Sequence, residues 1–265
     1  MVTAAQARAK YDQLADRYEE IYFYVADAGR RLVEFATPPP RARALDVGAG
    51  RGAVARALLA QGCEVTAIDA SPVMMERLKA DHPAVTASAM DAAELTFSDG
   101  SFDLVTAGFV VQVLDDPAAV LAEIRRVLVP GGVVALSLET QSLGRLAWMQ
   151  DLTAEFFPGG AGGAAQPSPM THDRLDALLA EAGFAELVRE SIEMPQPIAS
   201  PDALWEWLLP RGGADLLRAF GERGEEFHTR FLEGAQRMHD DGGIVLDFAA
   251  TLHRGLKPST VDRPA

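Results

Sequence analysis

Cysteine and long apolar runs are both scarce in this sequence. Cys63 is the only cysteine, so an internal disulfide is excluded, and so is a cysteine cluster that holds a metal. The longest apolar stretches, around residues 104–114 and 127–138, are broken by Gly, Gln or Pro. A membrane-spanning helix needs about 20 apolar residues, and the charged first residues carry no apolar signal core. We therefore expect a cytoplasmic, metal-independent protein without a membrane segment.

Basic residues are also few. The 24 Lys and Arg residues stand against 38 Asp and Glu residues, which gives a net charge of -14 over 265 residues. A phosphate backbone is repelled by such a chain unless a local basic patch overrides the field, and the short arginine pairs are too sparse for that. The composition therefore excludes nucleic acid as a partner and favours a small-molecule ligand.

Three glycines, by contrast, stand close together in one short turn. Gly48, Gly50 and Gly52 follow an apolar stretch at 44–47, which predicts a buried strand that turns sharply into a helix. Without Cβ atoms the backbone can pass close to a ligand, and the start of the helix directs unpaired N–H groups to the same place. The helix runs to about residue 62, and a second strand ends on Asp69. The pattern indicates a nucleotide-binding turn.

Acidic residues follow three successive predicted strands, and they separate two interpretations of this turn. Gly48, Gly50 and Ala53, with Asp69 about 20 residues on, fit the fingerprint of a nicotinamide dinucleotide site. That interpretation leaves Asp46 and Asp91 unexplained. A carboxylate beside the first glycine repels a pyrophosphate and attracts an ammonium or sulfonium group. The three acids therefore favour a cationic nucleoside over a dinucleotide.

The order of the predicted elements gives the fold class. Strands at 44–47, 64–69, 84–89, 102–111 and 133–138 alternate with helices, which predicts an α/β, doubly wound parallel sheet with its ligand at the carboxyl ends of the strands. Residues 1–36 have the spacing of helices. The second half predicts a Gly/Ala/Pro-rich loop at 158–169, a sixth strand at 184–192, a helix at 215–239 and a last strand at 244–252. The loop fits a lid or a plain surface insertion equally well.

The ordered motifs resemble class I S-adenosylmethionine-dependent methyltransferases, in the small-molecule branch that is similar to ubiquinone-biosynthesis enzymes and is known as methyltransferase type 11. They are Leu-Asp-Val-Gly-Ala-Gly-Arg-Gly at 45–52, Asp69, Met90-Asp91, Ser-Phe-Asp-Leu-Val at 101–105, Leu-Asp-Asp-Pro at 114–117 and Arg-Val-Leu-Val-Pro-Gly-Gly at 126–132. The resemblance covers roughly residues 8–140. It implies a Rossmann-like, seven-stranded, mostly parallel sheet whose last strand runs antiparallel between the fifth and sixth.

The pattern of elements along the chain also predicts a domain plan. A helical segment at 1–40 covers the cofactor site, the cofactor-binding core occupies 41–140, and a loop or lid occupies 141–170. The rest of the sheet and a helical substrate cap, at about 200–240, fall within 171–255, and 256–265 is a flexible tail.

The cofactor implied is S-adenosyl-L-methionine, with S-adenosyl-L-homocysteine as product. Asp46 would lie near the methionyl amine, Asp69 would bind the ribose hydroxyls and Asp91 the adenine amino group. The full set implied for cofactor binding is Tyr11, Tyr18, Asp46, Gly48, Ala49, Gly50, Asp69, Ala70, Met74, Met90, Asp91, Ala92, Phe109 and Val110.

The catalytic machinery is less well marked. Many relatives carry a histidine just past the fourth strand, where this chain has Gln112, and glutamine cannot act as a general base at neutral pH. His228 and His239 are the other candidates for a catalytic base, and His172 and His253 are weaker ones. The aromatic residues of the cap could form an apolar acceptor pocket or simply a core; they are Trp148, Phe157, Trp205, Phe227 and Phe231.

Three functions therefore remain in view. The first is methyl transfer to an O, N or C nucleophile of a small apolar or aromatic acceptor, chiefly by proximity and orientation, in a monomer or homodimer. The second is a fold relative that binds S-adenosylmethionine without transferring methyl, as a cyclase or a binding protein. The third is a nicotinamide-dependent oxidoreductase.

Overall fold

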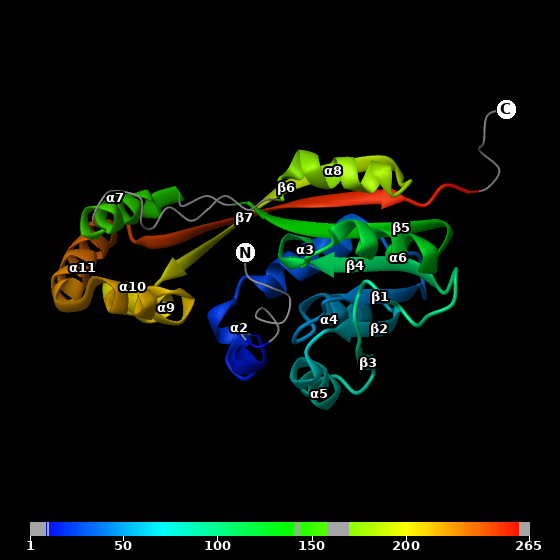
Figure 1. Cartoon of the computed structure of the whole chain (residues 1–265), viewed down its shortest axis with the longest axis horizontal. Helices are drawn as coiled ribbons and strands as arrows, with labels where there is room; N and C mark the ends of the chain where they lie inside the picture. The colour runs from blue at the N-terminus through cyan, green and yellow to red at the C-terminus, as the bar shows by residue number, and fades with distance from the viewer. Residues whose placement is uncertain (1–8, 10, 141–143, 158–169, 260–265) are drawn as a thin grey trace. The chain divides into compact units, whose positions relative to one another are not determined.

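A seven-stranded sheet forms the centre of the computed structural model, which describes residues 9, 11–140, 144–157 and 170–259 (Figure 1). Its strand order is β3-β2-β1-β4-β5-β7-β6. The strands are β1 (Arg43–Val47), β2 (Glu64–Asp69), β3 (Thr86–Ala89), β4 (Phe102–Gly108), β5 (Leu128–Thr140), β6 (Ala185–Ile198) and β7 (Ile244–Leu256). Neighbouring strands from β3 to β5 pair in parallel.

The seventh strand runs against the others. Gly131, near the start of β5, donates to the carbonyl of Lys257, just past the end of β7, and Lys257 donates to the carbonyl of Gly132. When the start of one strand pairs with the end of its neighbour, the two strands are antiparallel. The β7 arrow accordingly points opposite to β4 (Figure 1). The predicted seven-stranded, mostly parallel sheet, with its last strand between the fifth and sixth, is confirmed.

The helices of the described residues are α2 (Tyr18–Ile21), α3 (Val25–Ala36), α4 (Ala53–Ala60), α5 (Pro72–Asp81), α6 (Pro117–Val127), α7 (Ala147–Phe156), α8 (His172–Glu181), α9 (Pro201–Leu208), α10 (Gly213–Phe220) and α11 (Gly224–Asp240). Four of the helices, α5, α6, α8 and α9, begin at a residue whose side chain caps the first turn. Ser71, Asp116, Thr171 and Ser200 each accept the backbone N–H three residues on. A side-chain oxygen there pairs one of the free N–H groups of the first turn. Of the helices in the described segments, none is long and apolar enough to cross a bilayer.

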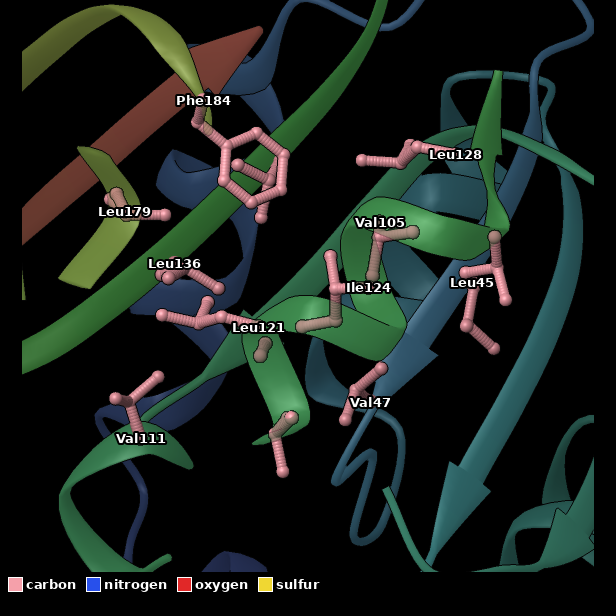
Figure 2. Packing of buried hydrophobic residues seen from close by; sticks show 14 of the residues in the cluster. Leu45, Val47, Val105, Val111, Leu121, Ile124, Leu128, Leu136, Leu179 and Phe184 are labelled. Carbon is pink, nitrogen blue, oxygen red and sulfur yellow. The ribbon is translucent and has the colours of Figure 1, made fainter. Parts of the chain in front are cut away.

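The core lies between the sheet and helices α6 and α8. Leu45 and Val47 of β1 and Val105 of β4 point toward Leu121 and Ile124 of α6 (Figure 2). Because successive side chains of a strand point to opposite faces, Asp46 must point to the other face of the sheet. On that face α3 and α4 pack together: a Cβ added to Gly29 of α3 would lie 3.0 Å from the backbone of Ala53. The alternation of β1 thus puts one carboxylate among helices rather than in solvent.

The described chain divides into two compact units. Unit 1 comprises Met1–Glu139, Ser168–Ile192 and Ala250–Ala265, and unit 2 comprises Thr140–Pro167 and Glu193–Ala249. Within the described residues, unit 2 contains α7, α9, α10 and α11 with the adjoining ends of β6 and β7. The predicted lid at 158–169 and the last residues of the predicted tail, 260–265, lie outside the described residues.

Several predicted bounds were wrong, and each error has a local cause. The fourth strand ends at Gly108, not Val111, because Phe109 takes a left-handed backbone conformation (φ 58°) and Val111–Val113 forms a short 3-10 helix. Val111 is buried in either arrangement, so its apolar character did not reveal the turn. The predicted helix at 215–239 is two helices, α10 and α11, separated at Gly221–Arg223.

The remaining differences concern length. The predicted N-terminal helix is interrupted between α2 and α3, where turns at 22–24 bring further tyrosines inward. Strands β5, β6 and β7 each extend several residues beyond the predicted ends, and β3 is two residues shorter than predicted at its start. In β5 the hydrophobic pattern marked the more buried part, because Val129, Pro130 and Gly131 are partly or fully exposed. In β6 the missed residues 193–198 include only one buried side chain, that of Met194.

Candidate active site

Asp46 is the most deeply buried acid of the site. Its side chain is 1% exposed, and Thr106 on β4 donates a hydrogen bond to its Oδ1 at 3.1 Å. Burial raises the pKa of the Asp46 carboxyl to about 7, although the hydrogen bond from Thr106 and the nearby backbone N–H of Ala55 act to lower it. No hydrogen bond of good geometry reaches its Oδ2 from any described residue. A buried acceptor without a partner is costly, so this oxygen is suited to a ligand donor.

The glycine turn and the end of β4 fit closely against each other. Gly48 has φ 65°, and a Cβ placed on it would lie 2.3 Å from Cγ2 of Val110. Any other residue at this position would displace Val110, so glycine is required by both conformation and space. Phe109 is held by two hydrogen bonds from its N–H to Ser137, one to Oγ at 3.0 Å and one to the carbonyl at 3.1 Å. The two turns therefore form one fixed wall.

Asp69 and Asp91 follow β2 and β3 at the same edge of the sheet as Asp46, because these strands are parallel. Asp69 accepts the N–H of Gly50 at 2.9 Å on Oδ2 and that of Ser71 at 2.9 Å on Oδ1. These bonds orient the carboxylate and leave each oxygen a second lone pair. Burial nevertheless raises the pKa of Asp69 above its ordinary value. Asp91 is exposed and accepts the N–H of Ala93 at 2.9 Å.

A cavity of about 510 Å³ opens at this edge of unit 1, and we call it the tyrosine-lined cavity. This volume falls in the usual range of small-molecule sites. Twelve of the residues predicted for cofactor binding line it: Tyr11, Tyr18, Gly48, Gly50, Asp69, Ala70, Met74, Met90, Asp91, Ala92, Phe109 and Val110. A smaller cavity of about 40 Å³ shares Gly48, Gly50 and Phe109 with it and is lined by the other two, Asp46 and Ala49. The structure thus gathers the whole predicted set.

All four tyrosines of the chain line this cavity, and all come from the N-terminal segment. Their rings form a row in which the centroids of Tyr18 and Tyr22 are 4.9 Å apart and those of Tyr22 and Tyr24 are 6.4 Å apart. The row ends on Phe109, whose centroid is 6.0 Å from that of Tyr24. Burial raises the pKa of the Tyr18 phenol well above its ordinary value, so Tyr18 stays neutral. The tyrosine row therefore presents aromatic rings to the cavity, with a neutral phenol at Tyr18.

Sequence analysis missed Tyr22, Tyr24 and Glu139 as lining residues. Glu139 lies at the end of β5, where its Oε1 accepts the hydroxyl of Tyr24 at 3.1 Å and its N–H donates to Oε1 of Gln112 at 3.0 Å. The sequence did contain a signal for Glu139, because this acid directly follows a predicted strand. Asp46, Asp69 and Asp91 were singled out because they also lie at the ends of predicted strands. Tyr22 and Tyr24 gave no such signal, because helical spacing does not show which side chains reach a cavity.

Of the predicted catalytic candidates, only Gln112 lies at the tyrosine-lined cavity. Gln112 lines the tyrosine-lined cavity, but His228 and His239 belong to α11 in unit 2. His239 is exposed, and the ring of His228 lies 4.4 Å from that of Trp205. The aromatic residues predicted as an acceptor pocket also lie in unit 2, where they pack on one another: Phe227 and Phe231 are fully buried, Trp205 is 8% exposed, Trp148 contacts Phe231, and Phe157 contacts Phe220. This packing is that of a core.

His172 and His253 form a separate polar group within unit 1. His253 is fully buried on β7, and its Nδ1 lies 2.7 Å from Oδ1 of Asp176 on α8. Its ring stacks on His172 with the centroids 5.6 Å apart. Burial lowers the pKa of His253 despite the neighbouring carboxylate, so it is neutral near pH 7. None of these residues lines the tyrosine-lined cavity. Their contacts hold α8 against β7 of the sheet.

One known protein family matches a segment that lies mostly in the first half of the chain. Residues 45–136 match the family described as a methyltransferase domain. Among curated relatives, the demethylmenaquinone methyltransferase of Renibacterium salmoninarum is 35% identical over 138 residues, 50% of this chain and 58% of that protein. The malonyl-[acyl-carrier protein] O-methyltransferase of Erwinia billingiae is 38% identical over 151 residues, 54% of this chain and 60% of that protein. The chain thus spans about half to three fifths of the length of the curated relatives it matches.

Solved structures extend the likeness of fold beyond the matched segment. The cyclase SpnF superimposes with a TM-score of 0.62 over 97% of this chain and 97% of its own, at 18% identity. At such low identity the likeness shows the fold alone.

Proposed function

We propose that this chain, whose residues 45–136 match a methyltransferase domain, transfers a methyl group from S-adenosylmethionine to an O, N or C nucleophile of a small molecule. The matched segment contains Asp46, the glycine turn, Asp69 and Asp91, and so includes most of the proposed cofactor site. The relatives named above are methyltransferases with different acceptors, so they support the reaction and leave the acceptor open.

The unpaired Oδ2 of Asp46 is the observation that carries this proposal. A buried carboxylate oxygen beside a glycine turn accepts a hydrogen bond from an ammonium group or from a water that such a group holds, but it repels a pyrophosphate. Asp69 keeps a lone pair on each oxygen for two adjacent hydroxyls, and Asp91 lies past β3, one strand further along the sheet. The amine, ribose and base of S-adenosylmethionine would each meet one aspartate.

S-adenosylmethionine supplies a methyl group that is already activated by its positive sulfur. The task left to the protein is to hold the acceptor in line and to keep water out. The fixed wall of Gly48, Phe109 and Val110 would hold one side, and the tyrosine row would cover the other. Gln112 cannot act as a base, and its carbonyl oxygen is used by the backbone of Glu139.

We also propose that the protein works as a monomer or homodimer in the cytoplasm. Its buried, unpaired Cys63 fits a reducing compartment, and its charge of -14 fits a small-molecule acceptor better than nucleic acid.

Calorimetry tests the proposal through the ligand preference of the purified protein. We expect binding of S-adenosylmethionine and S-adenosylhomocysteine and none of NADH. Asp69→Asn should weaken both by about tenfold or more, because a hydrogen bond to a charged acceptor is lost. Asp151→Asn, an exposed change on α7, should leave the affinity unchanged. Preferential binding of NADH, or an unchanged affinity of the Asp69→Asn variant, would contradict the assignment.

A further inference from the structure

The described lining of the tyrosine-lined cavity is acidic and includes no cationic side chain. Among its lining residues the charged ones are Asp69, Asp91 and Glu139, and none is Lys, Arg or His. An acceptor that carries a carboxylate or a phosphate would bury its charge here without a partner, which is strongly unfavourable. The lining therefore selects a neutral or positively charged acceptor.

Strand order separates Glu139 from the other two acids. The glycine turn follows β1, which lies between β2 and β4 in the sheet. Asp69 and Asp91 follow β2 and β3 on one side of β1, whereas Glu139 is at the end of β5 on the other side. Under the proposed function, Asp69 and Asp91 belong to the nucleoside. Glu139 is then the one lining carboxylate left for the acceptor.

Glu139 is fixed in place by its neighbours. Its backbone is held by Gln112 and its Oε1 by the hydroxyl of Tyr24, a side chain that is 4% exposed. No described residue is seen to bond its Oε2. The rings of Tyr22, Tyr24 and Phe109 line the same end of the cavity. A carboxylate beside aromatic faces is the chemistry that binds organic ammonium ions, through charge and through the negative faces of the rings.

We propose that the methyl acceptor is an amine, bound as its ammonium ion between the carboxylate of Glu139 and the rings of Tyr22 and Tyr24. This inference rests on the proposed function and names its substrate class. Glu139 also has a chemical role. An ammonium nitrogen has no lone pair, so it must lose a proton before it can accept a methyl group.

Glu139 receives that proton and passes it to solvent, to which its half-buried side chain has access. The freed lone pair forms the N–C bond to the methyl carbon, while the S–C bond breaks and leaves its electron pair on sulfur. One proton is released per methyl group transferred, and charge and atoms balance. Glu139 is thus a specific partner of the acceptor rather than a further cofactor ligand.

Binding of three matched probes to the protein loaded with S-adenosylhomocysteine tests the proposal without requiring turnover. The probes are phenethylamine, which is a cation at pH 7.5, the neutral phenethyl alcohol and the anion phenylacetate. We expect calorimetry to show phenethylamine bound at millimolar concentration or below, about fivefold or more tighter than the alcohol, with phenylacetate weakest. Glu139→Gln should abolish the preference for the amine while S-adenosylhomocysteine binds as before.

Glu76→Gln is the matched control, since it removes the same charge from an exposed site on α5 outside the cavity lining. It should bind all three probes as the unaltered protein does. The proposal is overturned if phenylacetate binds as well as the amine, if no probe binds at millimolar concentration, or if Glu139→Gln keeps the amine preference. Failure of S-adenosylhomocysteine to bind at all would instead refute the proposed function, so the two failures are distinguishable.

Discussion

At the scale of single residues, Asp46 is a buried acid with one unpaired oxygen, which suits it to the cation proposed as its ligand. Because β1 alternates, Leu45 and Val47 fill the core while Asp46 faces α3 and α4, away from bulk water. Thr106 pairs only one of its oxygens. Burial that raises its pKa to about 7 leaves the empty protein with a partly protonated carboxyl near neutral pH. A cationic ligand stabilises the ionised form and pulls that pKa down.

The affinity for S-adenosylmethionine should therefore depend on pH. It should fall as the pH drops from about 7.5 to about 6, because protons then compete with the ligand for Asp46. Asp46→Asn keeps an oxygen that can accept from Thr106 but loses the charge, so it should weaken binding at pH 7.5 and flatten the profile. Titration calorimetry across this range measures both effects. An equally steep profile in the variant would assign the pH dependence to another group.

The stability of the empty protein should respond in the opposite sense. A carboxyl whose pKa is raised on folding stabilises the fold below its unfolded pKa, near 4, and this contribution is lost as the pH rises through about 7. Asp46→Asn should consequently lose less stability than the unaltered protein between pH 5 and 8, as thermal unfolding would reveal. A larger loss in the variant would refute this sign.

At the scale of elements, the N-terminal segment that carries the tyrosines is held by polar contacts to α4 and α5. Arg51 donates to the carbonyl of Ala15 at 2.6 Å, and Ser71 donates to Asp12. Two ion pairs add to these, Glu19 with Arg56 at 2.8 Å and Asp16 with Arg77 at 2.7 Å. Turns at 15–17 and 22–24 interrupt the helices of this segment, so these contacts and the tyrosine row help to determine its position.

These contacts should differ in strength according to burial. The side chain of Arg51 is 14% exposed, whereas those of Arg77 and Asp16 are 51% and 71% exposed. Arg77→Ala should accelerate amide hydrogen exchange over residues 15–22 by about fivefold at most, since exposed ion pairs contribute little. Arg51→Ala should accelerate it more, because it leaves the carbonyl of Ala15 without this donor. Equal rates in the two variants would show that burial does not set the strength of these contacts.

At the scale of the whole molecule, the chain builds two cores. Unit 1 packs the sheet against α6 and α8, and unit 2 packs aromatic side chains of α7, α9, α10 and α11 on one another. The rings of Phe156, Phe220 and Phe227 lie within 5.3 Å of one another between centroids. Every residue that lines the tyrosine-lined cavity belongs to unit 1.

Loss of volume in unit 2 should therefore affect stability more than cofactor binding. Phe227→Leu should lower the free energy of unfolding by about 1–3 kcal/mol, because Phe227 is fully buried. Phe157→Leu, the same change at a half-buried position, should cost less. Denaturant titration measures both, and calorimetry should find the affinity for S-adenosylhomocysteine within about twofold of that of the unaltered protein. A stable Phe227→Leu variant with altered ligand binding would place Phe227 in a site rather than a core.

The sequence alone determined the alternation of strands and helices and one edge of the site, while the seven-stranded order came from the resemblance to a known family. Short apolar runs, capping residues and the glycine turn act between neighbours in the chain, so they suffice to assign Asp46, Asp69 and Asp91 to the ends of parallel strands. The end of β4 was missed because a buried turn and a buried strand are equally apolar.

Only the tertiary structure decided what faces these acids. Glu139 and Tyr24 are 115 residues apart, and the tyrosines form a row only after α2, α3 and the turns between them pack on the sheet. The division of the aromatic residues into a separate core likewise depends on contacts between distant helices. Contacts between residues far apart in the chain leave no periodic trace in it, because they arise from packing that every part of the fold determines together.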